Sequence, residues 1–120
     1  MKIPFSPPDI TDEEIKEVTE VLKSGWITTG PKTKELERKI AEFCHTDRAV
    51  ALNSATACME MALRLFEIGP GDEVIVPSNT YIATALAVTY VGATPVFVEP
   101  DIKTYNIDPS RIEEAITEKT

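Results

Sequence analysis

The stretch Ala49-Val50-Ala51-Leu52-Asn53-Ser54-Ala55-Thr56-Ala57-Cys58-Met59-Glu60 decides how the rest of the chain is interpreted. Its apolar start, residues 49–52, predicts a buried strand, and residues 55–68 have the pattern of a helix. The first N–H groups of a helix have no partner within it, and the helix dipole favours an anion there. Ser54 and Thr56 can add hydroxyl donors, but capping is the usual role of such residues, so this stretch alone favours a capped helix over a phosphate site.

Composition and charge narrow the class of protein. The 120 residues are enough for one modest domain, and a hydrophobic fraction of 42% is ordinary for a globular protein. The net charge of −8 argues against nucleic acid or an anionic membrane surface as the main partner. No apolar run reaches membrane-spanning length and the N-terminus lacks the pattern of a signal peptide, so we expect a cytoplasmic protein.

The cysteines and the single histidine do not predict a metal site. Cys44 and Cys58 lie in helical patterns without the spacing of a metal-binding pair, so we expect buried, reduced thiols. His45 stands beside Cys44, but two candidate ligands do not make a site. We expect His45 at the surface or at a helix end.

The N-terminal part of the chain predicts an extended arm followed by two helices. Three prolines in residues 1–10 indicate the arm, and Thr11-Asp12-Glu13-Glu14 is a capping box that opens a helix ending at Ser24-Gly25. A second helix starts at Pro31. The apolar positions predict inward faces on both helices: Ile15, Val18, Val21 and Leu22 on the first, and Leu36, Ile40 and Phe43 on the second.

The remainder of the chain alternates short strands and helices. Strands are expected at 73–76 and 95–98, a helix that is apolar almost all round ends at Val91, and a last helix begins with Asp108 as its N-cap and turns Ile112, Ala115 and Ile116 inward. This order predicts an α/β fold, with a parallel sheet covered on both faces through right-handed crossovers. Because the series is still running at Thr120, we expect the N-terminal part of a longer protein.

Two polar clusters are expected where strands end. Asn53-Ser54-Ala55-Thr56 follows the first predicted strand and Ser78-Asn79-Thr80-Tyr81 follows the second. Ligands of open α/β sheets bind beyond the carboxyl ends of the strands. Amides and hydroxyls beside an aromatic ring suit a flat phosphorylated cofactor, and the glycine-rich phosphate motifs are absent.

Four segments of the chain carry a resemblance to a known family. They are Ser24-Gly25-Trp26-Ile27-Thr28-Thr29-Gly30-Pro31, residues 53–57, residues 71–84 and residues 92–98. In this order they resemble the DegT/DnrJ family of pyridoxal-phosphate (PLP) sugar aminotransferases. Within the family the chain is similar to enzymes that aminate a nucleotide-linked 4-keto sugar, such as the 4-amino-4-deoxy-L-arabinose pathway enzyme. The resemblance implies the N-terminal part of the large domain of the aspartate-aminotransferase-like fold (PLP fold type I).

The resemblance also implies roles for particular residues. Ala55, Thr56 and Ala57 match the turn that holds the cofactor phosphate, and Tyr81 matches the aromatic position that stacks on the pyridine ring. The loop Trp26-Ile27-Thr28-Thr29-Gly30 matches a segment that approaches the active site and the dimer partner, so we expect it to be a substrate loop. On this basis residues 1–31 form an arm, helix and active-site loop, and residues 32–120 begin the PLP-binding domain.

The family's Schiff-base lysine, in a Ser-x-His-x-x-Lys motif, has no match in this chain. We therefore expect no catalytic residue in these 120 residues and no activity from them alone. The resemblance implies that the parent is a homodimer of cell-envelope polysaccharide biosynthesis that transfers an amino group from an amino acid, L-glutamate, to a keto sugar nucleotide. Two alternatives stay open: a PLP-dependent sugar dehydratase of the same family, and a non-catalytic regulatory relative that binds PLP or a nucleotide.

Overall fold

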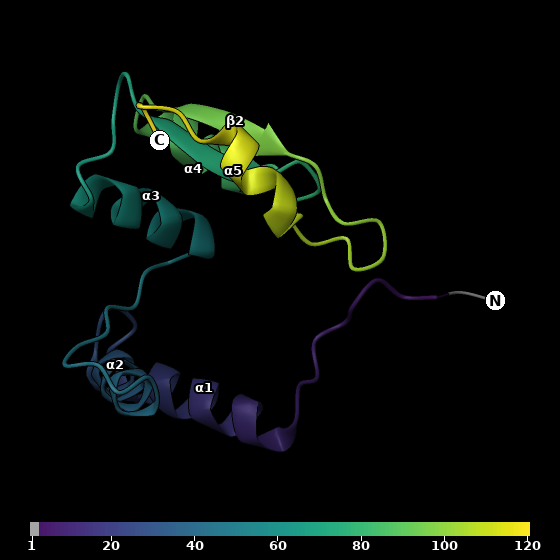
Figure 1. Cartoon of the computed structure of the whole chain (residues 1–120). Coiled ribbons are helices and arrows are strands. Elements are labelled where there is room, and N and C mark those ends of the chain that lie inside the picture. Colours follow the sequence, from purple (N-terminus) through teal and green to yellow (C-terminus); the bar gives the residue numbers. More distant parts are fainter. Residues whose placement is uncertain (1–2) are drawn as a thin grey trace. The chain divides into compact units, whose positions relative to one another are not determined.

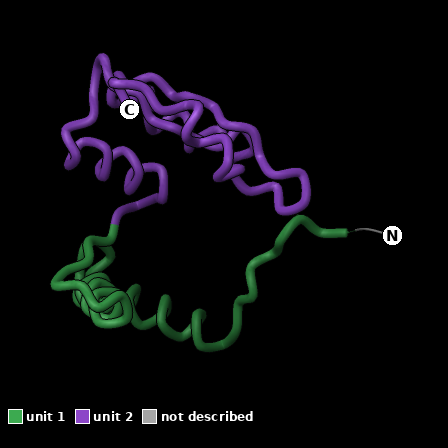
Figure 2. Tube along the Cα trace, viewed as in Figure 1, with its two compact units in different colours: residues 1–51 green, residues 52–120 purple. Residues whose placement is uncertain are grey.

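The computed structural model describes residues 3–120, so the first two positions of the predicted arm lie outside it. The chain divides into two compact units, residues 1–51 and 52–120 (Figure 2). This boundary reflects compactness, and the functional division at residues 31 and 32 remains a prediction. Each unit is described by itself below, with the element labels of Figure 1.

The first unit contains α1 (Asp12–Ser24) and α2 (Pro31–Phe43), preceded by an extended arm, as predicted. The capping box of α1 is confirmed: the Thr11 hydroxyl accepts from the N–H of Glu13 at 3.3 Å, and the Glu14 carboxylate accepts from the N–H of Thr11 at 2.6 Å. Gly25 ends the helix in the left-handed region, with φ of 72°.

The prediction that both helices bury an apolar face is wrong for this structure. Val18 on α1 is 60% exposed and Phe43 on α2 is 83% exposed, and among the described hydrophobic side chains of the unit only Ala41 is buried. An amphipathic stripe is buried only where another apolar surface packs on it, and the unit supplies none for these stripes. Caps and surface ion pairs such as Glu35–Lys39 support the helices instead.

The second unit is an α/β unit built from α3 (Ala55–Leu65), β1 (Glu73–Pro77), α4 (Ala83–Tyr90) and β2 (Thr94–Val98). A 3₁₀ turn (Pro109–Arg111) and the short helix α5 (Ile112–Ala115) follow. The two strands pair in parallel, from Glu73 opposite Thr94 to Pro77 opposite Val98. Helix α4 packs against both strands and against α3. The predicted parallel α/β arrangement is confirmed for these two strands.

The core of the second unit lies between α4 and the strands. Its buried members are Val76, Val88, Val91 and Ala93, with Leu63, Ile68 and Val74 packed against them. Because α4 is apolar on nearly every side, Ala85, Ala87 and Val88 are all buried, as predicted. Burying a side chain the size of valine contributes roughly 1.5 kcal/mol or more, so this cluster fixes how α4 lies on the sheet.

Two details of the predicted sheet and one of the last helix are wrong. Residues 49–52 form no strand and Val50 is 74% exposed: a strand needs a paired neighbour, and among the described residues β1 pairs with β2 alone. The sheet is not covered on both faces, since Phe97 of β2 is 56% exposed. Asp108 does cap the last helical segment, but α5 ends at Ala115 and Ile116 is extended and exposed.

Candidate functional site

The start of α3 holds hydrogen-bond donors that the fold leaves unused. Ser54 is the N-cap, and its hydroxyl accepts from the N–H of Ala57 at 3.1 Å, so the capping interpretation is confirmed. The N–H groups of Ala55 and Thr56 are the first two of the helix, and within residues 3–120 nothing accepts from them or from the Thr56 hydroxyl. Capping therefore occupies one amide and leaves two amides and a hydroxyl.

The starts of α3 and α4 lie at the same end of the unit. At the other end, Arg64 in the last turn of α3 donates to the backbone oxygen of Tyr90 in the last turn of α4, at 3.4 Å. Because the two helices pack on each other and their last turns are joined, they run in the same direction. Because α4 follows β1, its start is at the carboxyl end of the sheet, and α3 starts at that end too (Figure 1).

Tyr81 stands at this end of the unit, between β1 and α4. Its side chain is 80% exposed, so the ring is not half-buried against the start of the helix. Its backbone oxygen accepts from Thr84 at 3.0 Å, which fixes the backbone at this point. The structure thus places Thr56 and Tyr81 at one end of one unit and leaves the ring available.

Ser78 and Asn79 brace the turn that carries Tyr81. The N–H of Ser78 donates to the backbone oxygen of Val98 at 2.9 Å, and the amide of Asn79 donates to the backbone oxygen of Tyr105 at 3.4 Å. The loop that follows β2 is therefore a neighbour of this turn, which the sequence analysis missed. In the sequence, the only indication of a turn in this loop is Asp101, which bonds to Lys103 and Thr104.

Asp101 is occupied by its own loop. Its carboxylate accepts from the N–H of Lys103 at 3.0 Å and of Thr104 at 2.9 Å. The hydrogen bonds from Thr104 lower the pKa of Asp101, which stays ionised at neutral pH. Because this carboxylate accepts hydrogen bonds within its own turn, we assign Asp101 no role toward a ligand.

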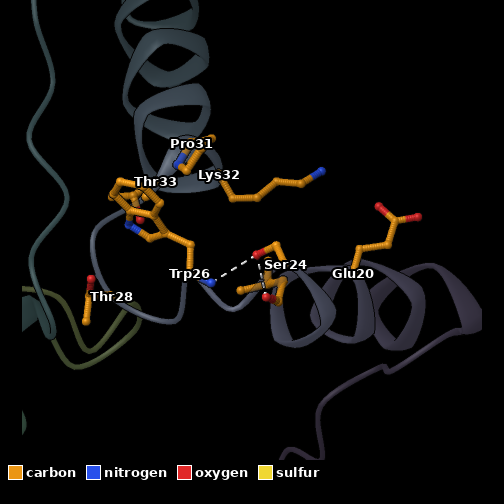
Figure 3. Close-up of a pocket in the computed structure, with 9 residues that line it drawn as sticks. Glu20, Ser24, Trp26, Thr28, Pro31, Lys32 and Thr33 are labelled. Carbon is orange, nitrogen blue, oxygen red and sulfur yellow. Dashed lines mark hydrogen bonds between the residues drawn. The ribbon is translucent and has the colours of Figure 1, made fainter.

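The predicted substrate loop lies in the first unit, between α1 and α2. Trp26 is 59% exposed, and its indole N–H donates to the backbone oxygen of Thr29 at 3.1 Å. The backbone N–H of Trp26 donates to the Ser24 hydroxyl, also at 3.1 Å. Beside the indole is a hollow of about 190 Å³ (Figure 3). The nine residues that line it are Glu20, Val21, Ser24, Trp26, Thr28, Gly30, Pro31, Lys32 and Thr33.

The lysines of the described chain are all exposed. Lys32 forms an ion pair with Glu17, and the hydrogen bond to that carboxylate raises the pKa of Lys32. A lysine nucleophile needs the opposite change, because only its deprotonated amine reacts.

The two thiols differ from the prediction, while the histidine lies where it was expected. Cys44 and Cys58 are exposed rather than buried, because nothing packs over the helix surfaces that carry them. His45 follows the C-terminus of α2 and is exposed, as predicted. Residues 3–120 hold no cluster of three metal-ligating side chains, and no helix among them is both long and apolar enough to cross a membrane.

A parallel βαβ unit defines an α/β protein, and the ligands of such proteins bind beyond the carboxyl ends of the strands. The sequence model of the DegT/DnrJ/EryC1/StrS aminotransferase family matches residues 8–120. The match covers nearly the whole chain, and the chain therefore belongs to this family.

Individual relatives agree with this assignment. The chain is 48% identical over 118 residues to the spore coat polysaccharide biosynthesis protein SpsC of Bacillus subtilis, covering 98% of the chain and 30% of SpsC. It is 58% identical to the PLP form of Spr1654 from Streptococcus pneumoniae, described as a sugar aminotransferase, with a TM-score of 0.90 and coverage of 100% of the chain and 31% of that protein. NtdA of Bacillus subtilis with bound PMP is 38% identical, with a TM-score of 0.86, over 99% of the chain and 29% of NtdA.

These likenesses confirm two predictions, the family and the fold class of PLP aminotransferases. The narrower likeness to the 4-amino-4-deoxy-L-arabinose enzyme remains a prediction. The chain spans about 30% of the length of the relatives it matches.

Proposed function

We propose that the protein containing this chain is a PLP-dependent aminotransferase that transfers an amino group from an amino acid, L-glutamate, to a keto sugar nucleotide. The observation that carries the proposal is the donor set at the start of α3: two free amides, of Ala55 and Thr56, and the Thr56 hydroxyl. Family membership supports it, as do the PLP and PMP forms in which relatives were solved.

The donor set fits a phosphate group. Amides at a helix start point along the axis toward an anion, and the helix dipole adds to their attraction. Helix α3 has no acidic residue in its first turn, so nothing there repels a dianion. The methyl side chains of Ala55 and Ala57 let a phosphate approach the backbone closely. In this proposal all three residues, with Thr56, form the phosphate-binding turn.

Tyr81 is the proposed platform for the pyridine ring. An aromatic ring offers a flat apolar face for stacking, worth about 0.5–1.5 kcal/mol beyond the area it buries. The cofactor, when bound, supplies the electron-withdrawing ring that makes amino transfer possible. This chain's contribution is to bind and orient that ring, with Ser78 and Asn79 holding the turn from which Tyr81 projects.

The proposal also covers the loop between α1 and α2, the oligomeric state and the cellular location. Residues Trp26–Gly30 are the proposed substrate loop, and the protein is proposed to act as a cytoplasmic homodimer. The described lysines are exposed and none lies in the family's Schiff-base motif, so we expect the isolated 120-residue chain to catalyse no transamination.

The test uses the purified full-length protein with PLP. Adding L-glutamate should shift the cofactor absorbance band, and a keto sugar nucleotide should then restore the band and yield an amino sugar nucleotide, detected by mass spectrometry. The isolated chain under the same conditions should produce neither change. A full-length protein that binds PLP but shows no glutamate-dependent shift would contradict the proposed activity.

A further inference from the structure

The loop between α1 and α2 is closed around the indole of Trp26. The Ser24 hydroxyl donates to the backbone oxygen of Val21 at 2.7 Å and accepts from the N–H of Trp26, which ties the start of the loop to α1. The indole N–H then reaches across to the backbone oxygen of Thr29, which ties the start of the loop to its end. One side chain thus spans the whole loop.

The indole of Trp26 packs against Gly30. A Cβ atom at Gly30 would lie 2.5 Å from Cδ1 of Trp26, closer than Cβ atoms approach other atoms in proteins, and 3.0 Å from its Nε1, which is a tight contact. The backbone at Gly30 does not itself need glycine, since its φ is −126° and its ψ is −164°, in the extended region open to every residue. A larger residue at position 30 would therefore displace the indole, although the backbone conformation itself would accept it.

The closure leaves three side chains of the loop uncommitted. Ile27 is 70% exposed, and the hydroxyls of Thr28 and Thr29 have no hydrogen-bond partner among residues 3–120. Thr28 also lines the hollow beside the indole, and Figure 3 shows it apart from the ring, on the far side of the loop. An apolar side chain next to a free hydroxyl can contact a ring that carries both C–H and O–H groups.

We infer that Trp26 and Gly30 are positioning residues that hold the loop closed, so that Ile27 and Thr28 are the side chains it presents to the sugar acceptor. The inference rests on the proposed function for the loop's role toward the sugar. The contact between Trp26 and Gly30 stands on the geometry alone. The two residues should therefore act as a unit, because each matters only while the other is present.

The experiment compares four variants of the full-length protein: Gly30→Ser, Trp26→Ala, the double variant, and Gly69→Ser as the matched control. Serine is a good N-cap, so Gly30→Ser adds the clash without weakening the start of α2. At Gly69 a Cβ would meet only an ordinary contact, 3.6 Å from the backbone oxygen of Val91. The readouts are the KM for the keto sugar nucleotide and the rate of the half-reaction with L-glutamate.

Gly30→Ser should raise the acceptor KM about tenfold, since a clash of this kind costs on the order of 1.4 kcal/mol. The glutamate half-reaction should change less than about twofold, because the donor does not need the closed loop. The double variant should match Trp26→Ala alone. The inference is overturned if Gly30→Ser behaves like Gly69→Ser, or if the effects of the two single variants multiply.

A second measurement separates this inference from the proposed function. Trp26 is the only tryptophan of the 120-residue chain, and subtracting the emission of the Trp26→Ala variant isolates its fluorescence in the full-length protein. Gly30→Ser should move the emission maximum to longer wavelength as the indole is released into water, and Gly69→Ser should not. If the full-length protein transfers no amino group, the proposed function fails while this test of the closed loop still applies; an unchanged emission maximum would overturn the closure itself.

Discussion

Both units of the chain contain helices with apolar side chains, but these side chains are buried to different degrees in the two units. In residues 52–120, α4 lies on two paired strands and its Val88 is 2% exposed. In residues 3–51, α1 has a clear cap and both helices have apolar stripes, yet Val18 and its neighbours face solvent. The second unit contains the partner that its apolar residues need, and the first does not.

This difference separates what local sequence decides from what packing decides. Caps, turn glycines and i,i+4 ion pairs act within one helix, so they form in both units. An apolar side chain is buried only when a second surface packs on it. In the described residues such a surface forms mainly where strands and helices alternate. Stability should therefore respond to core mutations in the second unit and mainly to helix-end mutations in the first.

The largest effect should come from truncating the core. Val88→Ala removes two buried methyl groups and leaves a cavity, which should cost about 2.5 kcal/mol of unfolding free energy. The same change on α1, Val18→Ala, should cost less than about 0.5 kcal/mol because the side chain is already exposed. Urea unfolding of both variants measures this, and equal losses would remove the distinction between the units.

A smaller effect is expected at a left-handed glycine in each unit. Gly92 has φ of 84°, and a Cβ there would lie 3.0 Å from the ring of Pro70, so Gly92→Ala should cost roughly 2 kcal/mol. Gly25 has φ of 72° but open space around it, so Gly25→Ala should cost about 1 kcal/mol, for the backbone alone. Amide hydrogen exchange near each site reports the change; a larger loss at Gly25 would contradict the role given to Pro70.

The smallest effect should be a pH dependence confined to α1. Hydrogen bonds from Thr11 lower the pKa of Glu14 below its ordinary value of 4.5. A carboxylate whose pKa is lower in the folded state stabilises it above the unfolded pKa, and this contribution is lost as pH falls through the folded value. Nuclear magnetic resonance shifts of residues 11–15 should therefore show fraying of α1 below about pH 4.5.

Replacing Glu14 by glutamine provides the control for that titration. Glutamine keeps an acceptor for the N–H of Thr11 and cannot ionise, so Glu14→Gln should remove the pH dependence in this range. Fraying that persists in Glu14→Gln would assign it to another group.

Sequence reasoning succeeded where the signal is local. The capping box at Thr11, the Ser54 and Asp108 caps, the strands near 73–77 and 94–98 and the apolar helix α4 are all visible in short segments. It failed where a distant neighbour decides the outcome, as at residues 49–52, Phe97 and the two thiols. Residues 49–52 look like a strand by composition, yet no backbone among the described residues pairs with them.

The candidate site was predictable only in part, again where the sequence signal is local. The donors of α3 follow from its helix-start pattern and the ring of Tyr81 from the strand-to-helix pattern of β1 and α4, although the strand expected before α3 is absent. The contact between Asn79 and the backbone of Tyr105 joins residues 26 positions apart, and no local pattern indicates it. The closed loop at Trp26 needed the position of the indole against Gly30, which sequence does not give.

The central claim is that the start of α3 binds the phosphate of PLP, and the dissociation constant of PLP from the full-length protein tests it most directly. Thr56→Val removes one donor to a charged group, so the constant should rise roughly tenfold. Thr89→Val is the control, because the Thr89 hydroxyl bonds to the backbone oxygen of Leu86 at the far end of α4 and its loss should change PLP affinity less than about twofold. Equal PLP affinities for Thr56→Val and Thr89→Val would contradict the account.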